Sequence, residues 1–108
     1  MLNKETISVL EENLQKLQKV KLIKGFYPSG IAIGAKISNK DAIEYLETIG
    51  VDKFNLKRSY VLNDEDVNLI GIYENLEDVP EDTYVENSHG EEVYVGENQY
   101  NIQYSFKN

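Results

Sequence analysis

Apolar residues recur every three to four positions near the start of the chain, at Ile7, Leu10, Leu14 and Leu17. This spacing places them on one stripe of a helix, which we predict from Lys4 to Ile23. Asn3 or Thr6 is available to cap its N-terminus. Acidic residues come early in this segment and lysines late, an order that complements the helix macrodipole. Gly25 is a natural stop, and residues 26–30 are typical of a connector.

Residues 30–37 alternate between larger apolar and small residues, a pattern that predicts a strand. Small side chains on one of its faces would allow another backbone or helix to approach closely. Residues 38–41, with the sequence Ser-Asn-Lys-Asp, resemble a capping box. We therefore predict a second helix over residues 38–50 that ends at Gly50 and buries Ala42, Ile43, Leu46 and Ile49.

From Val51 onward the hydrophobic period changes to two, which predicts strands. The first of them carries an inward face of Phe54, Leu56, Tyr60 and Leu62. Residues 63–66 form a turn, residues 67–73 return as its partner strand, and residues 76–80 form a loop. Residues 83–86 and 92–95 flank the hairpin connection 87–90. The last strand, over residues 98–107, directs four side chains inward, namely Tyr100, Ile102, Tyr104 and Phe106.

The expected order of elements is α-β-α-β-β-β-β-β, which predicts the α+β class. The architecture would be an N-terminal helix and then a β-α-β-β unit, extended by C-terminal antiparallel hairpins into one mostly antiparallel sheet. A chain of 108 residues suits a single domain over residues 1–108. The charged N-terminus and the lack of a long apolar run predict a cytoplasmic protein without a membrane segment. The single arginine and the many Asn and Ile residues suit an AT-rich genome, so we expect a bacterial cell or a phage-infected host.

The charge of the chain is distributed unevenly. Residues 1–60 hold ten Lys and Arg against seven Asp and Glu, a formal charge of +3. Residues 61–108 hold one Lys against twelve Asp and Glu, a formal charge of −11. Such a density of carboxylates projects a negative field, so this half is not expected to bind nucleic acid directly.

Motifs for cofactor or metal chemistry are incomplete. Gly25 and Gly30 have the spacing of a phosphate-binding loop, but the lysine that should follow Gly30 is missing. Asp64, Asp66 and Asn68 match the start of a calcium loop, but its glycine and final glutamate positions hold Leu69 and Asn75. The chain has no cysteine, and His89 is its single histidine. We therefore predict no catalytic residue, no metal site and no cofactor, and expect a protein that is not an enzyme.

The candidate binding surface consists of the carboxylates of the acidic half together with two tyrosines. Tyr84 and Tyr94 are expected to be exposed because neighbouring valines compete for the inner face of the sheet, and exposed tyrosine beside carboxylate suits protein recognition. The residues of this acidic surface are Asp64, Glu65, Asp66, Glu74, Glu77, Asp78, Glu81, Asp82, Tyr84, Glu86, Glu91, Glu92, Tyr94 and Glu97.

The main hypothesis is a small acidic protein-binding module that imitates nucleic acid and blocks a basic partner such as a nuclease or toxin. Small acidic phage inhibitors of host defence nucleases provide the analogy. One alternative is an immunity or antitoxin-like protein. Another is a structural subunit that assembles as a homodimer through the first helix, whose apolar spacing resembles a short coiled coil. A face kept acidic for solubility is the competing interpretation of the carboxylates.

Overall fold

The computed structural model describes residues 2–20 and 25–107, and the chain divides into two compact units. The first unit comprises Met1–Lys57 and Tyr104–Asn108, and the second comprises Arg58–Gln103. Strands β1 (Leu56–Asn63) and β5 (Asn101–Phe106) contribute residues to both units. The predicted α+β class is confirmed. That the chain folds as a single domain stays a prediction.

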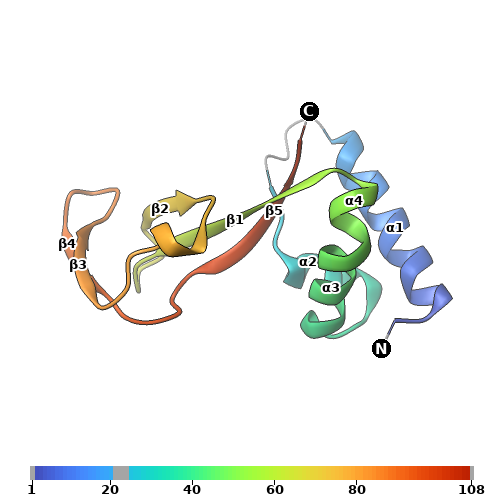
Figure 1. The fold of residues 1–108 in the computed structure, drawn as a ribbon, viewed down its shortest axis with the longest axis horizontal. Coiled ribbons are helices and arrows are strands. Elements are labelled where there is room, and N and C mark those ends of the chain that lie inside the picture. Colours follow the sequence, from blue (N-terminus) through green and yellow to red (C-terminus); the bar gives the residue numbers. More distant parts are fainter. Residues whose placement is uncertain (1, 21–24, 108) are drawn as a thin grey trace. The chain divides into compact units, whose positions relative to one another are not determined.

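The helices belong to the first unit (Figure 1). Helix α1 packs against α2, and α2 packs against α3. The chain then continues without a break from α3 through a π-helical turn into α4. The bounds of these elements are α1 (Lys4–Lys19), α2 (Pro28–Ala35), α3 (Asn39–Tyr45), η1 (Leu46–Gly50) and α4 (Val51–Lys53).

Helix α1 forms as its hydrophobic pattern predicts. Asn3 caps it, because the Asn3 Oδ1 accepts a hydrogen bond from the backbone N–H of Thr6 at 2.8 Å. Leu10 and Leu14 are fully buried. The predicted helix extended to Ile23, but α1 ends at Lys19, and residues 21–23 lie outside the described part of the chain.

The predicted strand over residues 30–37 is wrong, because these residues form most of helix α2. Pro28 occupies the first helical position, where its fixed φ and missing N–H favour a helix start. The helix ends at Lys36, which adopts a left-handed conformation with φ 58°. Ile31 and Ala32 are buried while Ile33 is exposed, so packing against α1 and α3 selects the helix over the alternating pattern.

Ser38 caps the second helix as predicted, since its Oγ accepts a hydrogen bond from the backbone N–H of Asp41 at 3.1 Å. The predicted end at Gly50 is wrong, because the helical conformation continues to Lys53. Gly50 is buried, and a Cβ there would lie 3.3 Å from Leu46 and 3.5 Å from Leu56. Gly50 therefore serves close packing and does not terminate the helix.

Phe26 and Tyr45 anchor the core of the first unit. Phe26 forms an antiparallel bridge with Tyr104 of β5, with hydrogen bonds of 2.8 and 2.9 Å. Tyr45 is fully buried, and its hydroxyl has no hydrogen-bond partner within the described residues. Burial, together with the negative charge of Glu11, raises the pKa of Tyr45 to about 12.

The strands form two sheets and not the single sheet that the sequence predicts. One has the strand order β2-β1-β5, with β2 (Leu69–Tyr73) antiparallel to β1. The other is the antiparallel hairpin of β3 (Thr83–Glu86) and β4 (Glu92–Val95), at the bounds that the sequence predicts. The 3-10 turn η2 (Leu76–Asp78) lies between β2 and β3, within the predicted loop.

The core of the second unit is centred on four buried residues, Tyr60, Leu62, Val79 and Val95. Partly buried side chains pack around them, among them Tyr100 and Ile102. The rings of Tyr60 and Tyr100 make an edge-to-face contact with centroids 5.2 Å apart. Of the four side chains predicted to face inward at the end of the chain, only Tyr104 is fully buried, and Tyr100, Ile102 and Phe106 are half-buried.

Candidate functional site

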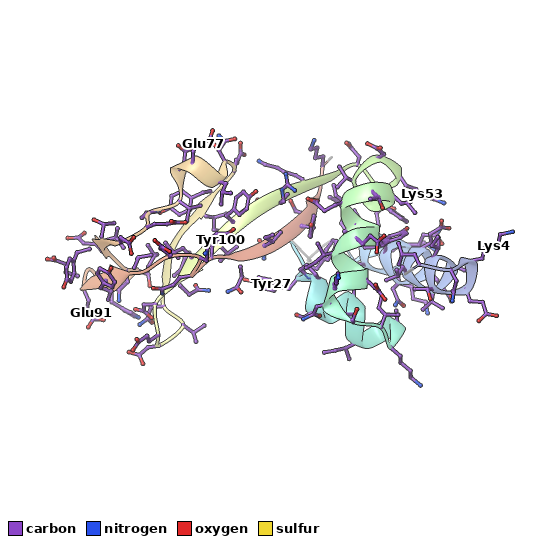
Figure 2. All side chains as sticks on the ribbon, turned by 60° about the horizontal axis from the view of Figure 1, so that its bottom comes forward. Lys4, Tyr27, Lys53, Glu77, Glu91 and Tyr100 are labelled. Atoms are coloured by element: carbon purple, nitrogen blue, oxygen red, sulfur yellow. The ribbon has the colours of Figure 1, made fainter. Side chains whose placement is uncertain are left out.

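All members of the acidic surface lie in the second unit, and all are exposed except Asp64, which is half-buried. They lie in the β1–β2 turn, around η2, on the β3–β4 hairpin and in the turn before β5. Glu77 on η2 and Glu91 at the hairpin tip extend away from the strands (Figure 2). The second unit holds Arg58 as its single Lys or Arg against twelve Asp and Glu, a formal charge of −11.

Four residues of this surface share one face of the β3–β4 hairpin. Tyr84 pairs with Tyr94, and Glu86 pairs with Glu92. Since side chains alternate along a strand, these four lie together, and we call them the hairpin face. Tyr84 and Tyr94 are 65% and 54% exposed, and their rings make an edge-to-face contact with centroids 5.3 Å apart. The predicted exposure of both tyrosines is confirmed.

The opposite face of the hairpin holds the valines that compete with the tyrosines. Val95 is fully buried, while Val85 and Val93 are half-buried. This inner face anchors the hairpin to the core of the second unit, because Val85 and Val95 both contact that core. The hairpin face is therefore held outward by the burial of its reverse side.

Asp82 and the two glutamates make the hairpin face strongly negative. Tyr94 Oη donates a hydrogen bond to Asp82 Oδ1 at 3.2 Å. This hydrogen bond is the main cause that raises the pKa of Tyr94, and partial desolvation and nearby negative charge contribute less. Glu86 and Glu92 stand directly opposite each other, an arrangement of like charges that destabilises a strand pair. The hairpin therefore carries a charge pattern that its own stability does not favour.

The β1–β2 turn, residues 64–68, is organised around the carboxylate of Asp64, and we call it the acidic turn. Asp64 Oδ1 accepts hydrogen bonds from the backbone N–H groups of Asp66 and Asn68, both at 2.9 Å. Asp64 Oδ2 accepts from Asn87 Nδ2 at 2.7 Å and from Asn68 Nδ2 at 3.2 Å. These hydrogen bonds, of which the one from Asn87 has the largest effect, hold the pKa of Asp64 below its usual range.

Asn87 ties the hairpin tip to the acidic turn, and sequence reasoning missed this role. Its side chain is only 7% exposed. Besides its bond to Asp64, Asn87 Oδ1 accepts hydrogen bonds from the backbone N–H groups of His89 at 2.9 Å and Glu91 at 3.0 Å. His89 Nε2 also lies 3.0 Å from Asn68 Oδ1. The position of Asn87 at the start of the predicted turn 87–90 was the available signal for this role. Asn side chains in turns commonly hydrogen-bond to the backbone two residues later in the chain.

Val67 is a second residue whose role the sequence did not indicate. It was predicted to begin the strand, but β2 begins at Leu69. Val67 has φ 63°, a left-handed conformation that a β-branched residue rarely adopts, and its side chain is 77% exposed. The acidic turn holds this conformation through the bond from Val67 N to Asp64 O at 3.0 Å. An apolar side chain is thus displayed among carboxylates at a conformational cost.

The acidic turn and strand β4 line a cavity of about 310 Å³, to which the hairpin face contributes Tyr94. The structure therefore brings together members of the acidic surface that are some thirty positions apart in the sequence. Of the acidic surface, Asp64, Glu65, Asp66 and Tyr94 line the cavity, and the other ten members do not. The residues that line it are Asp64, Glu65, Asp66, Val93, Tyr94 and Gln99.

The side chains that line this cavity give the site a fixed negative charge. In the described ranges no three His, Asp or Glu side chains converge where a metal ion could be held. The carboxylate of Asp64, the first residue of the calcium-like motif, is already occupied by backbone and amide donors. Within the described residues no helix is long and apolar enough to cross a membrane. Comparison with protein-family models, with curated proteins and with solved structures gives no match.

Proposed function

We propose that this protein is a small acidic binding module whose second unit engages a basic protein partner in the manner of nucleic acid. The observation that carries the proposal is the composition and exposure of that unit, which holds twelve carboxylates and two exposed, contacting tyrosines but a single arginine. A phage- or mobile-element-type inhibitor of a nuclease is the class that this surface fits best, and the module itself is proposed to catalyse no reaction.

The electrostatics of the second unit favour a basic partner. Carboxylates of one sign with few compensating cations produce a field that attracts a positive surface and accelerates association. On the hairpin face, cross-strand neighbours have Cβ atoms roughly 4.5–5.5 Å apart. Residues two apart on one strand lie roughly 6.5–7 Å apart. Glu86 and Glu92, the carboxylate pair of this face, can occupy a groove that is built for phosphates, with Tyr84 and Tyr94 two residues away on the same strands.

Aromatic and apolar groups give this surface more than charge. Tyr84 and Tyr94 together present a large, rigid contact area of the kind that dominates binding energy at interfaces. Val67 adds an exposed apolar side chain whose conformation is unfavourable for the isolated protein. A face kept acidic only for solubility would not require such groups, so they support a role in binding.

The test uses a double charge reversal on the hairpin face, Glu86→Lys with Glu92→Lys. It replaces one pair of like charges by another, so the repulsion across the strands is kept and the fold should be unaffected. Wild-type and variant proteins are immobilised and used to capture partners from bacterial lysate, and the captured protein is then purified. We expect the reversal to weaken binding of that protein at least about tenfold near 0.05 M salt, with a smaller difference near 0.5 M.

A matched control reverses two exposed acids of the first unit, Glu44→Lys with Asp52→Lys, and changes the net charge equally. This control should retain near wild-type binding. Tyr84→Ala should weaken binding at both salt concentrations, and single-stranded or duplex nucleic acid should compete for the partner. A partner that binds equally at low and high salt, or that tolerates the hairpin-face reversal, would contradict the proposal.

A further inference from the structure

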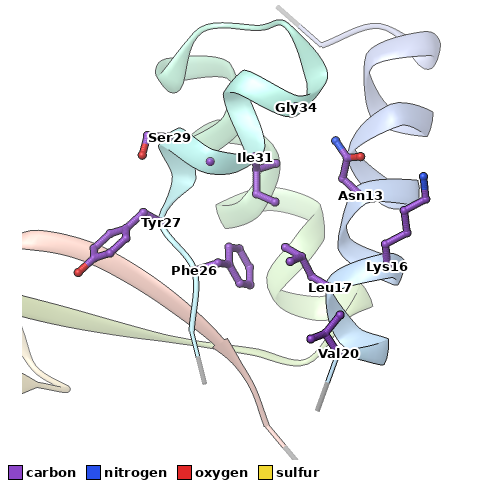
Figure 3. Close-up of a pocket in the computed structure, with 10 residues that line it drawn as sticks. Asn13, Lys16, Leu17, Val20, Phe26, Tyr27, Ser29, Ile31 and Gly34 are labelled. Carbon is purple, nitrogen blue, oxygen red and sulfur yellow. The ribbon is translucent and has the colours of Figure 1, made fainter. Parts of the chain in front are cut away.

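The first unit contains a cavity of about 550 Å³ between α1 and residues 26–34, which include most of α2 (Figure 3). Its apolar wall is formed by Leu17, Phe26 and Ile31, and the last two are buried. Exposed residues, among them Lys16 and Tyr27, line its opening. Both its volume and its largely apolar wall are typical of small-molecule sites, which occupy about 300–1,000 Å³.

Gly30 lines this cavity, and its backbone conformation does not require a glycine. Its φ is not positive, and a Cβ at this position would have no heavy atom within 4 Å. Glycine inside a helix costs up to about 1 kcal/mol relative to alanine, and α2 has only eight residues. The chain therefore forgoes helix stability at a position where its own packing would accept a side chain. The space beside Gly30 is therefore open to an occupant of the cavity.

Lys16 gives the cavity opening a positive charge. Its Nζ lies 3.6 Å from Glu12 Oε1, one turn earlier on α1, and both side chains are largely exposed. An exposed pair of this kind contributes little and exchanges readily. The ammonium can therefore turn to a ligand anion at the edge of an otherwise apolar wall.

We propose that this cavity binds a small apolar carboxylate. Its hydrocarbon or aromatic part would cover Leu17, Phe26 and Ile31, and its carboxylate would lie beside Lys16. The site is independent of the acidic surface, because every residue that lines it belongs to the first unit. It would add a small-molecule ligand to a protein whose second unit is proposed to bind a protein.

The test titrates decanoate, below its micellar concentration, into the full-length protein by calorimetry, with decanol as the uncharged probe. We expect saturable binding of decanoate and weaker binding of decanol. Lys16→Gln should weaken decanoate binding about two- to fivefold, as expected for an exposed charge pair, and leave decanol unchanged. Lys19→Gln is the matched control, because Lys19 is an exposed lysine of α1 that does not line the cavity.

Gly30→Leu should fill the cavity and weaken decanoate binding at least tenfold while the melting temperature is kept. Ile33→Ala, at an exposed position of α2 outside the cavity wall, should retain binding. If Gly30→Leu does not fold, methyl NMR of the wild-type protein replaces it. Decanoate should then shift the signals of Leu17, Val20 and Ile31 and leave those of Leu62 and Val95 in place.

Several outcomes would overturn the proposal. They are the absence of saturable decanoate binding at millimolar concentration, equal binding of decanoate and decanol, or binding that survives Gly30→Leu in a folded variant. If the methyl signals of Leu17 and Ile31 shift with protein concentration in the absence of decanoate, the cavity is instead a contact site for a second copy of the chain. None of these results bears on the acidic surface, so failure here is distinguishable from failure of the proposed function.

Discussion

Replacing Asn87 by alanine tests whether one buried amide organises the acidic turn and the hairpin tip. The amide oxygen accepts two backbone N–H groups, from His89 and Glu91, and each such hydrogen bond contributes roughly 0.5–1.5 kcal/mol. We therefore expect Asn87→Ala to lower the free energy of unfolding by about 1–3 kcal/mol, measured by urea denaturation near pH 7. Asn101→Ala, at an exposed position of β5, is the matched control and should change stability by less than about 0.5 kcal/mol.

The same variant should change the titration of Asp64. Asn87 Nδ2 supplies the strongest of the hydrogen bonds that lower the pKa of Asp64, so the pKa should rise toward its usual value when the amide is removed. A carboxyl with a lowered folded pKa stabilises the protein above its unfolded pKa of about 3.9, and this stabilisation is lost as pH falls through the folded pKa. The stability difference between wild type and Asn87→Ala should therefore shrink below about pH 4.

NMR titration of the Asp64 carboxyl carbon, together with urea unfolding at several pH values, measures both effects. An unchanged pKa of Asp64 in the variant would refute the assignment of Asn87 as the main cause. A loss of stability below about 0.5 kcal/mol near pH 7 would show that the hairpin tip is ordered without the amide.

Three further predictions concern packing and charge. Leu62→Ala, at a fully buried position, should lower the free energy of unfolding by about 2–5 kcal/mol, measured by urea denaturation. Ile72→Ala, at a position 57% exposed on the neighbouring strand, should lower it by less than about 0.5 kcal/mol. Similar losses for the two variants would mean that the core is misplaced. The single change Glu86→Lys should stabilise the hairpin by roughly 0.5–1 kcal/mol, because it turns a repulsive pair into an attractive one, and a lower melting temperature would contradict this. Tyr45→Phe should stabilise the protein by about 1 kcal/mol, because it removes a buried hydroxyl without a partner among the described residues. Ultraviolet titration of the wild type should show that Tyr45 resists ionisation to about pH 12. A destabilised variant would reveal a hydrogen bond of that hydroxyl.

Local patterns were sufficient for the elements whose neighbours in sequence are also their neighbours in space. The stripe of α1 places Leu10 and Leu14 in the core because a helix brings residues four apart onto one face. The β3–β4 hairpin has its predicted bounds because both strands and the turn between them lie within the thirteen residues 83–95. Its alternation also placed Val95 inside and both tyrosines outside. The concentration of negative charge in the second unit could likewise be read directly from the sequence.

Interactions between distant residues decided the rest. Residues 30–37 have the alternation of a strand, but the packing of α2 against α1 and α3 makes residues 30–35 helical. Gly50 looks like a helix stop and is instead a point of close contact with Leu46 and Leu56.

Within the candidate site, the sequence predicted which residue types would be exposed, while the tertiary structure determined which of them act together. The bond between Asn87 and Asp64 joins residues 23 positions apart, and no local pattern reports such a bond. The left-handed φ of Val67 has a local cause instead, because the hydrogen bonds around Asp64 lie within the acidic turn. Hydrophobic periodicity records only which side of an element is buried, and a binding surface depends in addition on which elements meet.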